Sequence, residues 1–227
     1  MDYIPDSRIS IQVGLSGYSF QIEDQGTVHS SGWQGAERIF TTQEFQRRYD
    51  RADIALFTPK FTLVPKQFFN PLSARQALSE VVSIQDSDMV DHIDVPAFNA
   101  ELVYSNSIGE SLSKVISQTV LDHSGNPFPV LPEVYFLLDA VASCKEYNKI
   151  LASYMDGYLY LVIAQGKSLQ LCNVFAAGDF TTAEYFIFLA LNRLQLNPEV
   201  STITFRTPLS SEQEMSLYRY FKAVEII

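Results

Sequence analysis

The strongest constraint on the fold of this chain is an order of strand and helix signals that occurs twice. Residues 9–82 contain three runs of alternating apolar and polar side chains, followed by a helical pattern, a fourth strand and a second helix. Residues 149–221 contain the same order of signals. We therefore predict an α/β protein with mixed sheets, built from two β-β-β-α-β-α units.

The spacing of the two halves agrees as well as their order. Three pairs of landmarks are separated by about 140 residues each: the turns Ser16-Gly17 and Asp156-Gly157, the helix caps Thr41 and Thr181, and the strands at Thr62 and Thr202. We interpret this common offset as an internal duplication of one supersecondary unit. The predicted domains are a first lobe over residues 1–100 and a second lobe over residues 101–227. Helices within residues 110–145 would complete or link the lobes.

The first two strands are predicted to form a hairpin, because a Ser-Gly pair separates two alternating runs. One face of the first strand would carry the apolar side chains of Ile9, Ile11, Val13 and Leu15. A helix would begin at Thr41, and residues 53–65 return to a strand pattern. Asn70 and Pro71 are typical of a helix start, so a helix is predicted over residues 70–82.

The remaining elements follow from the same signals. Residues 84–99 are polar and acidic and are predicted to be a loop. A strand is expected at 100–107 and helices at 110–121 and 133–147, and the last helix would be capped by Ser210 or Ser211. The helix that follows Thr181 is apolar on nearly every face, so most of its large side chains should be buried, including Phe186, Phe188, Leu189 and Leu191.

Composition narrows the class of protein. Apolar residues make up 47% of the chain and charged residues 19%, which favours a well-packed core. The net charge of −10 would repel a phosphate backbone, so nucleic acid is not an expected partner. Two cysteines, Cys144 and Cys172, are too few for a disulfide framework, which favours a reducing cytoplasm. No apolar run reaches the roughly 20 residues that cross a bilayer, so we expect no membrane span.

Three segments of the chain resemble a known family. The opening "ISIQVGLSGYSF", the "FTLVP" at residues 61–65 and the run "LQLCNVFAAGDFTTAEYFIFLALNRLQLNPE" are similar to a bacterial family of unknown function with a degenerate actin-like fold. Two tandem units of the predicted order resemble the actin-like ATPases, whose units have the ribonuclease H-like fold. These motifs are structural, so the resemblance implies a fold and no catalytic residues.

The resemblance also implies where a ligand would bind. In the actin-like ATPases the phosphates of a nucleotide lie between the lobes, at the turns of two equivalent hairpins. The equivalent turns here are "GLSGYS" and "MDGYLY". The first has Leu15 and Ser16 where an acidic residue is expected, and in the second the glycine is followed by the bulky Tyr158. Candidate ligand residues in this cleft are Ser16, Gly17, Asp156, Gly157 and Arg206, with Arg206 as an anion partner.

Two functions follow from these residues, and the sequence leaves both open. The first is a non-catalytic interaction or assembly module in the cytoplasm, with a protein partner and no cofactor. The alternative is a nucleotide or small-anion binding protein, or an ATPase that uses ATP with magnesium. No metal site is expected, because a cluster of acidic residues and one histidine matches no calcium-loop spacing; its members are Asp86, Asp88, Asp91, His92 and Asp94.

Overall fold

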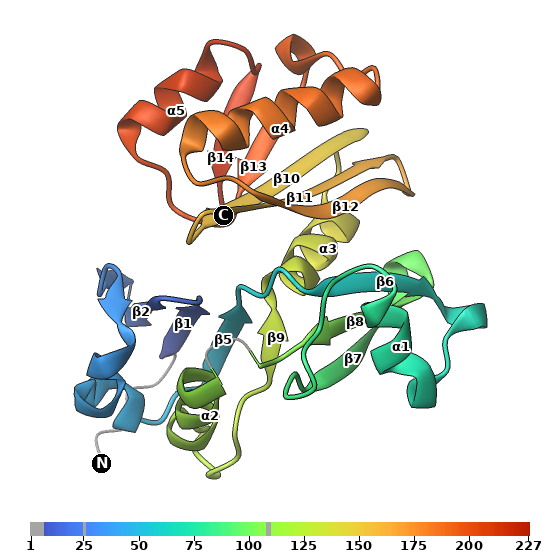
Figure 1. Cartoon of the computed structure of the whole chain (residues 1–227). Coiled ribbons are helices and arrows are strands. Elements are labelled where there is room, and N and C mark those ends of the chain that lie inside the picture. Colours follow the sequence, from blue (N-terminus) through green and yellow to red (C-terminus); the bar gives the residue numbers. More distant parts are fainter. Residues whose placement is uncertain (1–6, 25, 108–109) are drawn as a thin grey trace. The chain divides into compact units, whose positions relative to one another are not determined.

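A computed structural model describes residues 7–24, 26–107 and 110–227 of the chain. It contains three β-sheets and divides into two compact units (Figure 1). The first unit comprises Met1–Phe61, Ala74–Asp91 and Val103–Pro132, and the second comprises Thr62–Ser73, His92–Leu102 and Glu133–Ile227. These units interleave along the chain. The predicted lobes, 1–100 and 101–227, are contiguous segments, and this division stays a prediction.

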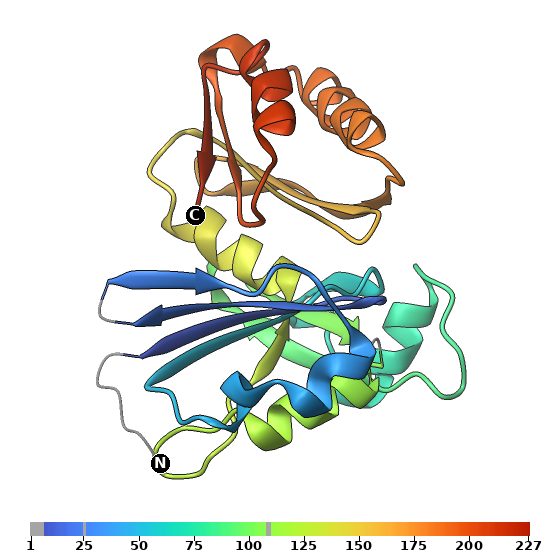
Figure 2. The ribbon, with the colours of Figure 1, turned by 90° about the vertical axis from the view of Figure 1, so that its left-hand side faces the viewer.

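The first sheet has the strand order β3-β2-β1-β5-β9, with β4 paired to β2. Strand β1 is antiparallel to β2 and parallel to β5. Its strands are β1 (Arg8–Val13), β2 (Gly17–Asp24), β3 (Thr27–Ser30), β4 (Gln34–Gly35), β5 (Arg51–Leu56) and β9 (Val130–Pro132). Helix α2 (Glu110–Thr119) packs on one face of this sheet, where Leu112 and Ile116 join a core with Ile11 (Figure 2).

The second sheet has the order β12-β11-β10-β13-β14, and its strands β10 and β11 are buried on both faces. Its strands are β10 (Asn148–Met155), β11 (Tyr158–Gln165), β12 (Ser168–Ala176), β13 (Thr202–Phe205) and β14 (Ala223–Ile226). Helices α4 (Phe180–Arg193) and α5 (Ser211–Tyr218) cover one face, and α3 (Glu133–Ser143) covers the other (Figure 1). The core under α4 includes Leu161, Ile187 and Phe205, all fully buried.

The two five-strand paths have the same order and the same strand directions. In each path three antiparallel strands come first, β3-β2-β1 or β12-β11-β10. The two strands that follow run parallel to β1 in the first sheet and to β10 in the second. This arrangement confirms the predicted α/β class with mixed sheets. The predicted equivalence of the strands at Thr62 and Thr202 is wrong, because β13 pairs with β10 as β5 pairs with β1, whereas Thr62 lies in a separate sheet.

That separate sheet has three strands in the order β6-β8-β7. Its strands are β6 (Phe61–Pro65), β7 (Val90–Val95) and β8 (Ala100–Ser105). The strand predicted over 53–65 is therefore two strands, β5 and β6, in different sheets, and the predicted loop at 84–99 contains β7. The polar side chains of β7 masked its strand signal, since "VDHIDV" has few apolar residues to alternate.

Helix starts were predicted with mixed success. Asn70 does cap the turn η4 (Pro71–Ser73) before α1 (Ala74–Ser79), because its Oδ1 accepts a hydrogen bond from the N–H of Leu72 at 3.0 Å. Ser210, one of the two residues predicted for this position, caps α5 in a capping box. Helix α4 is capped by Asp179 and not by Thr181, since the Asp179 carboxylate accepts from the N–H of Thr182 at 2.7 Å.

The helix predicted from Thr41 does not form. The segment instead has two short 3-10 helices, η1 (Ala36–Thr41) and η2 (Gln43–Gln46). The hydroxyl groups of Thr41 and Thr42 both donate to the carbonyl of Arg38, which competes with a longer α-helix that would start there. Other 3-10 helices are η3 (Lys66–Phe68), η5 (Pro96–Phe98) and η6 (Pro198–Val200).

Helix α4 is less buried than its sequence predicts. Leu191 is buried, with 1% of its surface exposed, but Leu189 is 37% exposed. Phe186 and Phe188 are half-buried at the margin of the core. The prediction for Leu189 is therefore wrong, because only one side of α4 faces the second sheet, although apolar residues occur around the whole helix.

Candidate functional site

In the first unit, the predicted ligand residues Ser16 and Gly17 lie at the connection between β1 and β2. The turn consists of Gly14, Leu15 and Ser16, and it is closed by a hydrogen bond from the N–H of Gly14 to the carbonyl of Gly17 at 2.9 Å. Leu15 is 49% exposed in this turn and does not continue the buried face of β1, contrary to the prediction. Gly17 is not a turn residue, because it is the first residue of β2.

The lack of a side chain at Gly17 allows another backbone segment to approach closely. It pairs with Gly35 of β4, and a Cβ atom added to Gly17 would lie 2.0 Å from the carbonyl oxygen of Gln34. That distance is far below a van der Waals contact, so a side chain at this position would push β4 away. The absence of a side chain at Gly17 is thus explained by close strand pairing within the chain.

In the second unit, Asp156 and Gly157 form the two-residue turn that the sequence predicts. Met155 pairs with Tyr158, and the two turn residues have φ angles of 55° and 78°. Positive φ at both central residues is typical of a type I′ hairpin turn. The carbonyl of Gly157 accepts a hydrogen bond from the N–H of Ala177 at 2.8 Å, which ties the turn to the end of β12.

Arg206 follows β13 and forms an ion pair within the second unit. Its Nε donates to Oε1 of Glu133 at 2.9 Å, and its guanidinium lies 4.7 Å from the ring centre of Phe136. The hydroxyl of Ser153 donates to the same oxygen of Glu133 at 2.6 Å. Glu133 is 1% exposed, and Ser153 is fully buried. The predicted anion partner therefore holds a carboxylate of its own chain.

Burial determines the electrostatics of this ion pair. Burial raises the pKa of the Glu133 carboxyl, while the charge of Arg206 and hydrogen bonds from Arg206 and Ser153 act in the opposite direction. A buried carboxylate of this kind stays ionised only with help from such partners. The positive charge of Arg206 is thereby compensated by Glu133.

Three of the predicted residues share one edge of the second sheet. Strands β10 and β13 are parallel, so their carboxyl ends lie on the same side. Asp156 and Gly157 follow β10, and Arg206 follows β13, with its N–H bonded to the carbonyl of Ala152 at 3.0 Å. Ser16 and Gly17 occupy the equivalent edge of the first sheet. A common site formed by both edges stays a prediction.

The sequence matches one protein family over nearly its whole length. A family model described as "Protein of unknown function (DUF3822)" matches residues 3–224. The chain belongs to this family. No curated protein matches the chain in sequence.

Solved structures show that the DUF3822 chain has an actin-like fold. A Bacteroides thetaiotaomicron protein, described as having an actin-like ATPase fold and unknown function, matches with a TM-score of 0.67 and 16% identity, over 99% of this chain and 91% of that one. The cytoplasmic domain of EpsL from Vibrio cholerae, described as an inner membrane component of the type II secretion system, matches with a TM-score of 0.51 and 15% identity, over 90% and 84%. A chain of the "PilM-PilN type IV pilus biogenesis complex" matches with a TM-score of 0.51 and 13% identity, over 97% and 88%.

Two of the acidic residues weighed as a metal site, Asp88 and Asp94, have other partners. Asp88 accepts a hydrogen bond from the ammonium group of Lys60 at 2.6 Å, which together with the N–H of Gln85 lowers the pKa of its carboxyl. Asp94 accepts from Lys66 at 2.7 Å. Within the residues that the structure describes, no group of three or more histidine, cysteine or acidic side chains could hold a metal ion.

The described part of the chain also bears on thiol chemistry and membrane insertion. Burial raises the pKa of the Cys172 thiol to about 12, so this cysteine is a poor nucleophile at neutral pH. Among the described helices, none has the length and apolar character that crossing a bilayer requires.

The sequence did not predict Glu133 and Ser153 as members of the cluster around Arg206. Glu133 and Arg206 are 73 residues apart, so no local pattern links them. One signal was present. An acidic residue at the start of the apolar helix "EVYFLLDAVAS" needs a cation if that end of the helix is buried.

Proposed function

We propose that this protein is a non-catalytic member of the actin-like fold that acts in the cytoplasm as an interaction or assembly module. One observation carries the proposal. At the positions where an actin-like ATPase would grip phosphates, the groups of this chain are engaged with the chain itself. Gly17 accommodates the backbone of Gln34, and Arg206 is paired with Glu133.

Exposed aromatic and apolar side chains on α4 and the segment around α5 support a protein partner. Tyr185 is 61% exposed and Met215 is 62% exposed. Tyr185 and Leu189 are four residues apart and share a face of α4. Phe188 of the same helix contacts Tyr220 edge-on, with 4.8 Å between ring centres. Tyrosine, phenylalanine and methionine are enriched at protein interfaces, so this surface has a suitable composition.

The similar structures give weaker support in the same direction. EpsL is described as a component of a secretion system, and PilM is described in a complex with PilN. Identity to both is low, so their assembly roles enter here only as an analogy based on fold. The analogy favours a role in which the fold presents a surface to another protein.

The second candidate is a nucleotide or small-anion binding protein, or an ATPase with magnesium. Its specific support is the turn of Asp156 and Gly157, which keeps an acidic side chain and a glycine at positive φ beside the parallel strands. Ligand binding in this case would use Ser16, Gly17, Asp156, Gly157 and Arg206.

Titration calorimetry with Mg-ATP tests the choice between the two functions. We expect no dissociation constant tighter than about millimolar, which is roughly 4 kcal/mol of binding free energy, because the chain carries a net charge of −10 and Arg206 is already neutralised. Steady-state ATP turnover is measured beside it, with Asp156→Ala as the matched variant. Low-micromolar binding together with turnover that is lost in Asp156→Ala would refute the non-catalytic function.

A further inference from the structure

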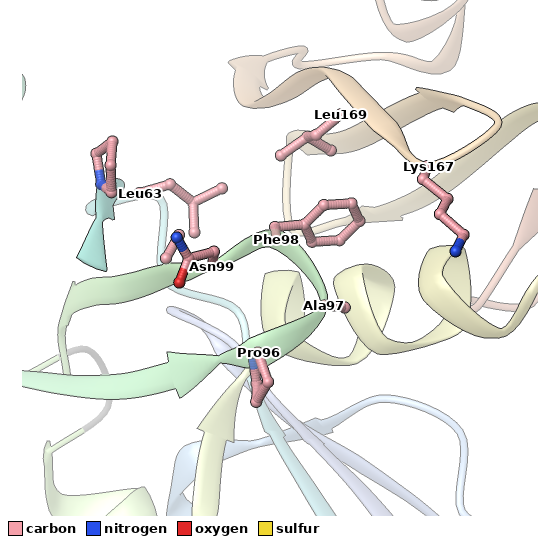
Figure 3. A pocket seen from close by; sticks show the side chains of 9 residues that line it. Leu63, Pro96, Ala97, Phe98, Asn99, Lys167 and Leu169 are labelled. Atoms are coloured by element: carbon pink, nitrogen blue, oxygen red, sulfur yellow. The ribbon is translucent and has the colours of Figure 1, made fainter. Parts of the chain in front are cut away.

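A groove in the second unit is lined by none of the candidate ligand residues. Its volume is about 460 Å³, and its lining is mostly apolar. One wall comes from β6 and the turn between β7 and β8, and the other from the start of β12 (Figure 3). The side chains of Leu63, Phe98 and Leu169 lie around the same space.

The turn between β7 and β8 holds its apolar wall in a fixed position. Pro96 begins the 3-10 helix η5, and Asn99 ends it in the left-handed conformation with φ 49°. The N–H of Asn99 donates to the carbonyl of Pro96 at 3.2 Å, and the carbonyl of Asn99 accepts from the N–H of Lys66 at 2.9 Å. Because these two hydrogen bonds fix the backbone of the turn, Phe98 stays half-exposed beside the groove.

The opposite wall belongs to an edge strand. Strand β12 is an edge strand of its sheet, and among the described strands it pairs only with β11. Proteins commonly protect such an edge with charged residues or proline, but Ser168–Ala176 contains neither. The pairing with β11 shifts register near Leu169, and the strand is regular from Leu171 to Ala176. An extended chain beside this edge could therefore form backbone hydrogen bonds with β12.

A single cation marks the border of the groove. Among the described residues that line the groove, Lys167 is the one that carries a charge, and it is exposed. Lys66, on the neighbouring segment, is paired with Asp94, whereas no ion pair of Lys167 occurs among the described residues. A solvated ammonium group beside apolar walls is complementary to a ligand that combines apolar side chains with a carboxylate.

We propose that this groove binds an extended segment of a partner protein, with apolar side chains against Phe98 and Leu169 and an acidic side chain at Lys167. This inference rests on the proposed function and deepens it by naming the chemistry of the partner. The strand edge favours an extended segment over a helix, and the lysine favours an acidic residue over a neutral one.

Selection from a phage-displayed library of random octapeptides on the immobilised full chain provides the probe. We expect the enriched peptides to share an acidic residue beside apolar ones. Binding of a synthetic copy, measured by fluorescence anisotropy, should weaken about tenfold or more in Phe98→Asp, which places a charge in the apolar wall. Phe68→Asp is the matched control, because Phe68 is 73% exposed, lies in the same unit and does not line the groove.

The charge is tested by a second pair of variants. Lys167→Glu should weaken binding of the same peptide by about two- to fivefold, the range of an exposed ion pair, while Lys222→Glu should not. Both lysines are exposed, so these substitutions leave the fold intact even if Phe98→Asp unfolds. Replacement of the acidic residue of the peptide by its amide should remove the difference between wild type and Lys167→Glu.

Three outcomes would overturn the inference: no enriched peptide, enriched peptides without an acidic residue, or binding that is equal in wild type, Phe98→Asp and Lys167→Glu. None of these outcomes touches the proposed function, which instead fails if Mg-ATP is turned over and Asp156→Ala abolishes the turnover. The two failures are therefore distinguishable.

Discussion

The ion pair between Arg206 and Glu133 can be broken by Arg206→Met, which keeps an apolar side chain over Phe136 but removes the cation. Removal of one partner from a buried pair leaves an uncompensated charge and typically costs about 3–5 kcal/mol. Glu133 is 1% exposed, so water cannot replace the lost hydrogen bonds. We expect a loss in this range in the free energy of unfolding at neutral pH.

The size of this loss should depend on pH. Burial raises the pKa of Glu133 in the folded protein above its ordinary value of 4.5, so the stability contributed by the protonated carboxyl is fully present below pH 4.5 and is lost as pH rises through the folded pKa. In wild type, Arg206 limits the decrease in stability as pH rises, because its charge favours the ionised carboxyl. Without Arg206 the pKa of Glu133 should rise further, and the decrease in stability between low and neutral pH should be larger. The variant should therefore resemble wild type near pH 4 and differ most at neutral pH.

Urea unfolding followed by circular dichroism at pH 4 and pH 7.5 measures this difference. The double variant Glu133→Gln/Arg206→Met should recover most of the stability at pH 7.5, because no buried charge remains. Lys66→Met is the matched control, since the Lys66–Asp94 pair is exposed in the same unit, and it should have a much smaller effect. A loss below about 1 kcal/mol at pH 7.5, or an equal loss at both pH values, would refute the buried-charge explanation.

Two further predictions concern packing. Gly17→Ala should destabilise the protein by about 1–3 kcal/mol in thermal unfolding, because the added Cβ would lie 2.0 Å from a backbone oxygen of β4, whereas Gly178→Ala has open space and should be nearly neutral. A stable Gly17→Ala variant would contradict the close strand approach. In α4, Leu191→Ala should cost about 2–5 kcal/mol and Leu189→Ala below about 1 kcal/mol, since their exposed fractions are 1% and 37%. Equal urea midpoints for these two variants would show that the helix faces are assigned wrongly.

The elements with strong local signals were predictable from the sequence. The alternation in β1 matches its burial, in which every second residue is buried. The apolar runs of β10 and β11 match strands that are buried on both faces. The turn of Asp156 and Gly157 also has a local signal, because few residue pairs tolerate positive φ at both central positions of a turn. The cap at Ser210 has the same local character, since both of its hydrogen bonds involve Gln213, three residues away.

The elements without local signals were missed. Strand β7 is polar, and β14 has four residues at the edge of its sheet, so neither produces a clear alternation. The two hairpins occupy equivalent places in the two strand orders, but the offset of about 140 residues pairs the strand at Thr62 with the wrong partner. The first unit has the short η1 and η2 where the second has the longer α4, so β5 follows β1 more closely than β13 follows β10.

The surroundings of the candidate site depend on contacts that sequence spacing does not encode. Glu133 reaches Arg206 across 73 residues, and the constraint on Gly17 comes from β4, a strand of two residues with no pattern of its own. The residue types at the turns could be predicted from the sequence. The contacts that Gly17 and Arg206 make with distant parts of the chain could not.

Gly17 and Arg206 bear on the choice of function without any reference to how the two units are arranged. The contact of Gly17 is internal to the first unit, and the ion pair of Arg206 is internal to the second. A nucleotide that used Arg206 would have to compete with a carboxylate that is buried beside it, and releasing Glu133 would leave that carboxylate buried without its cation. The cost estimated for Arg206→Met, about 3–5 kcal/mol, is of the same size as the roughly 4 kcal/mol of millimolar binding. A cost of about 4 kcal/mol would weaken micromolar binding to millimolar binding, so competition at Arg206 alone is large enough to keep the dissociation constant for ATP at about millimolar or weaker, as the proposed function requires.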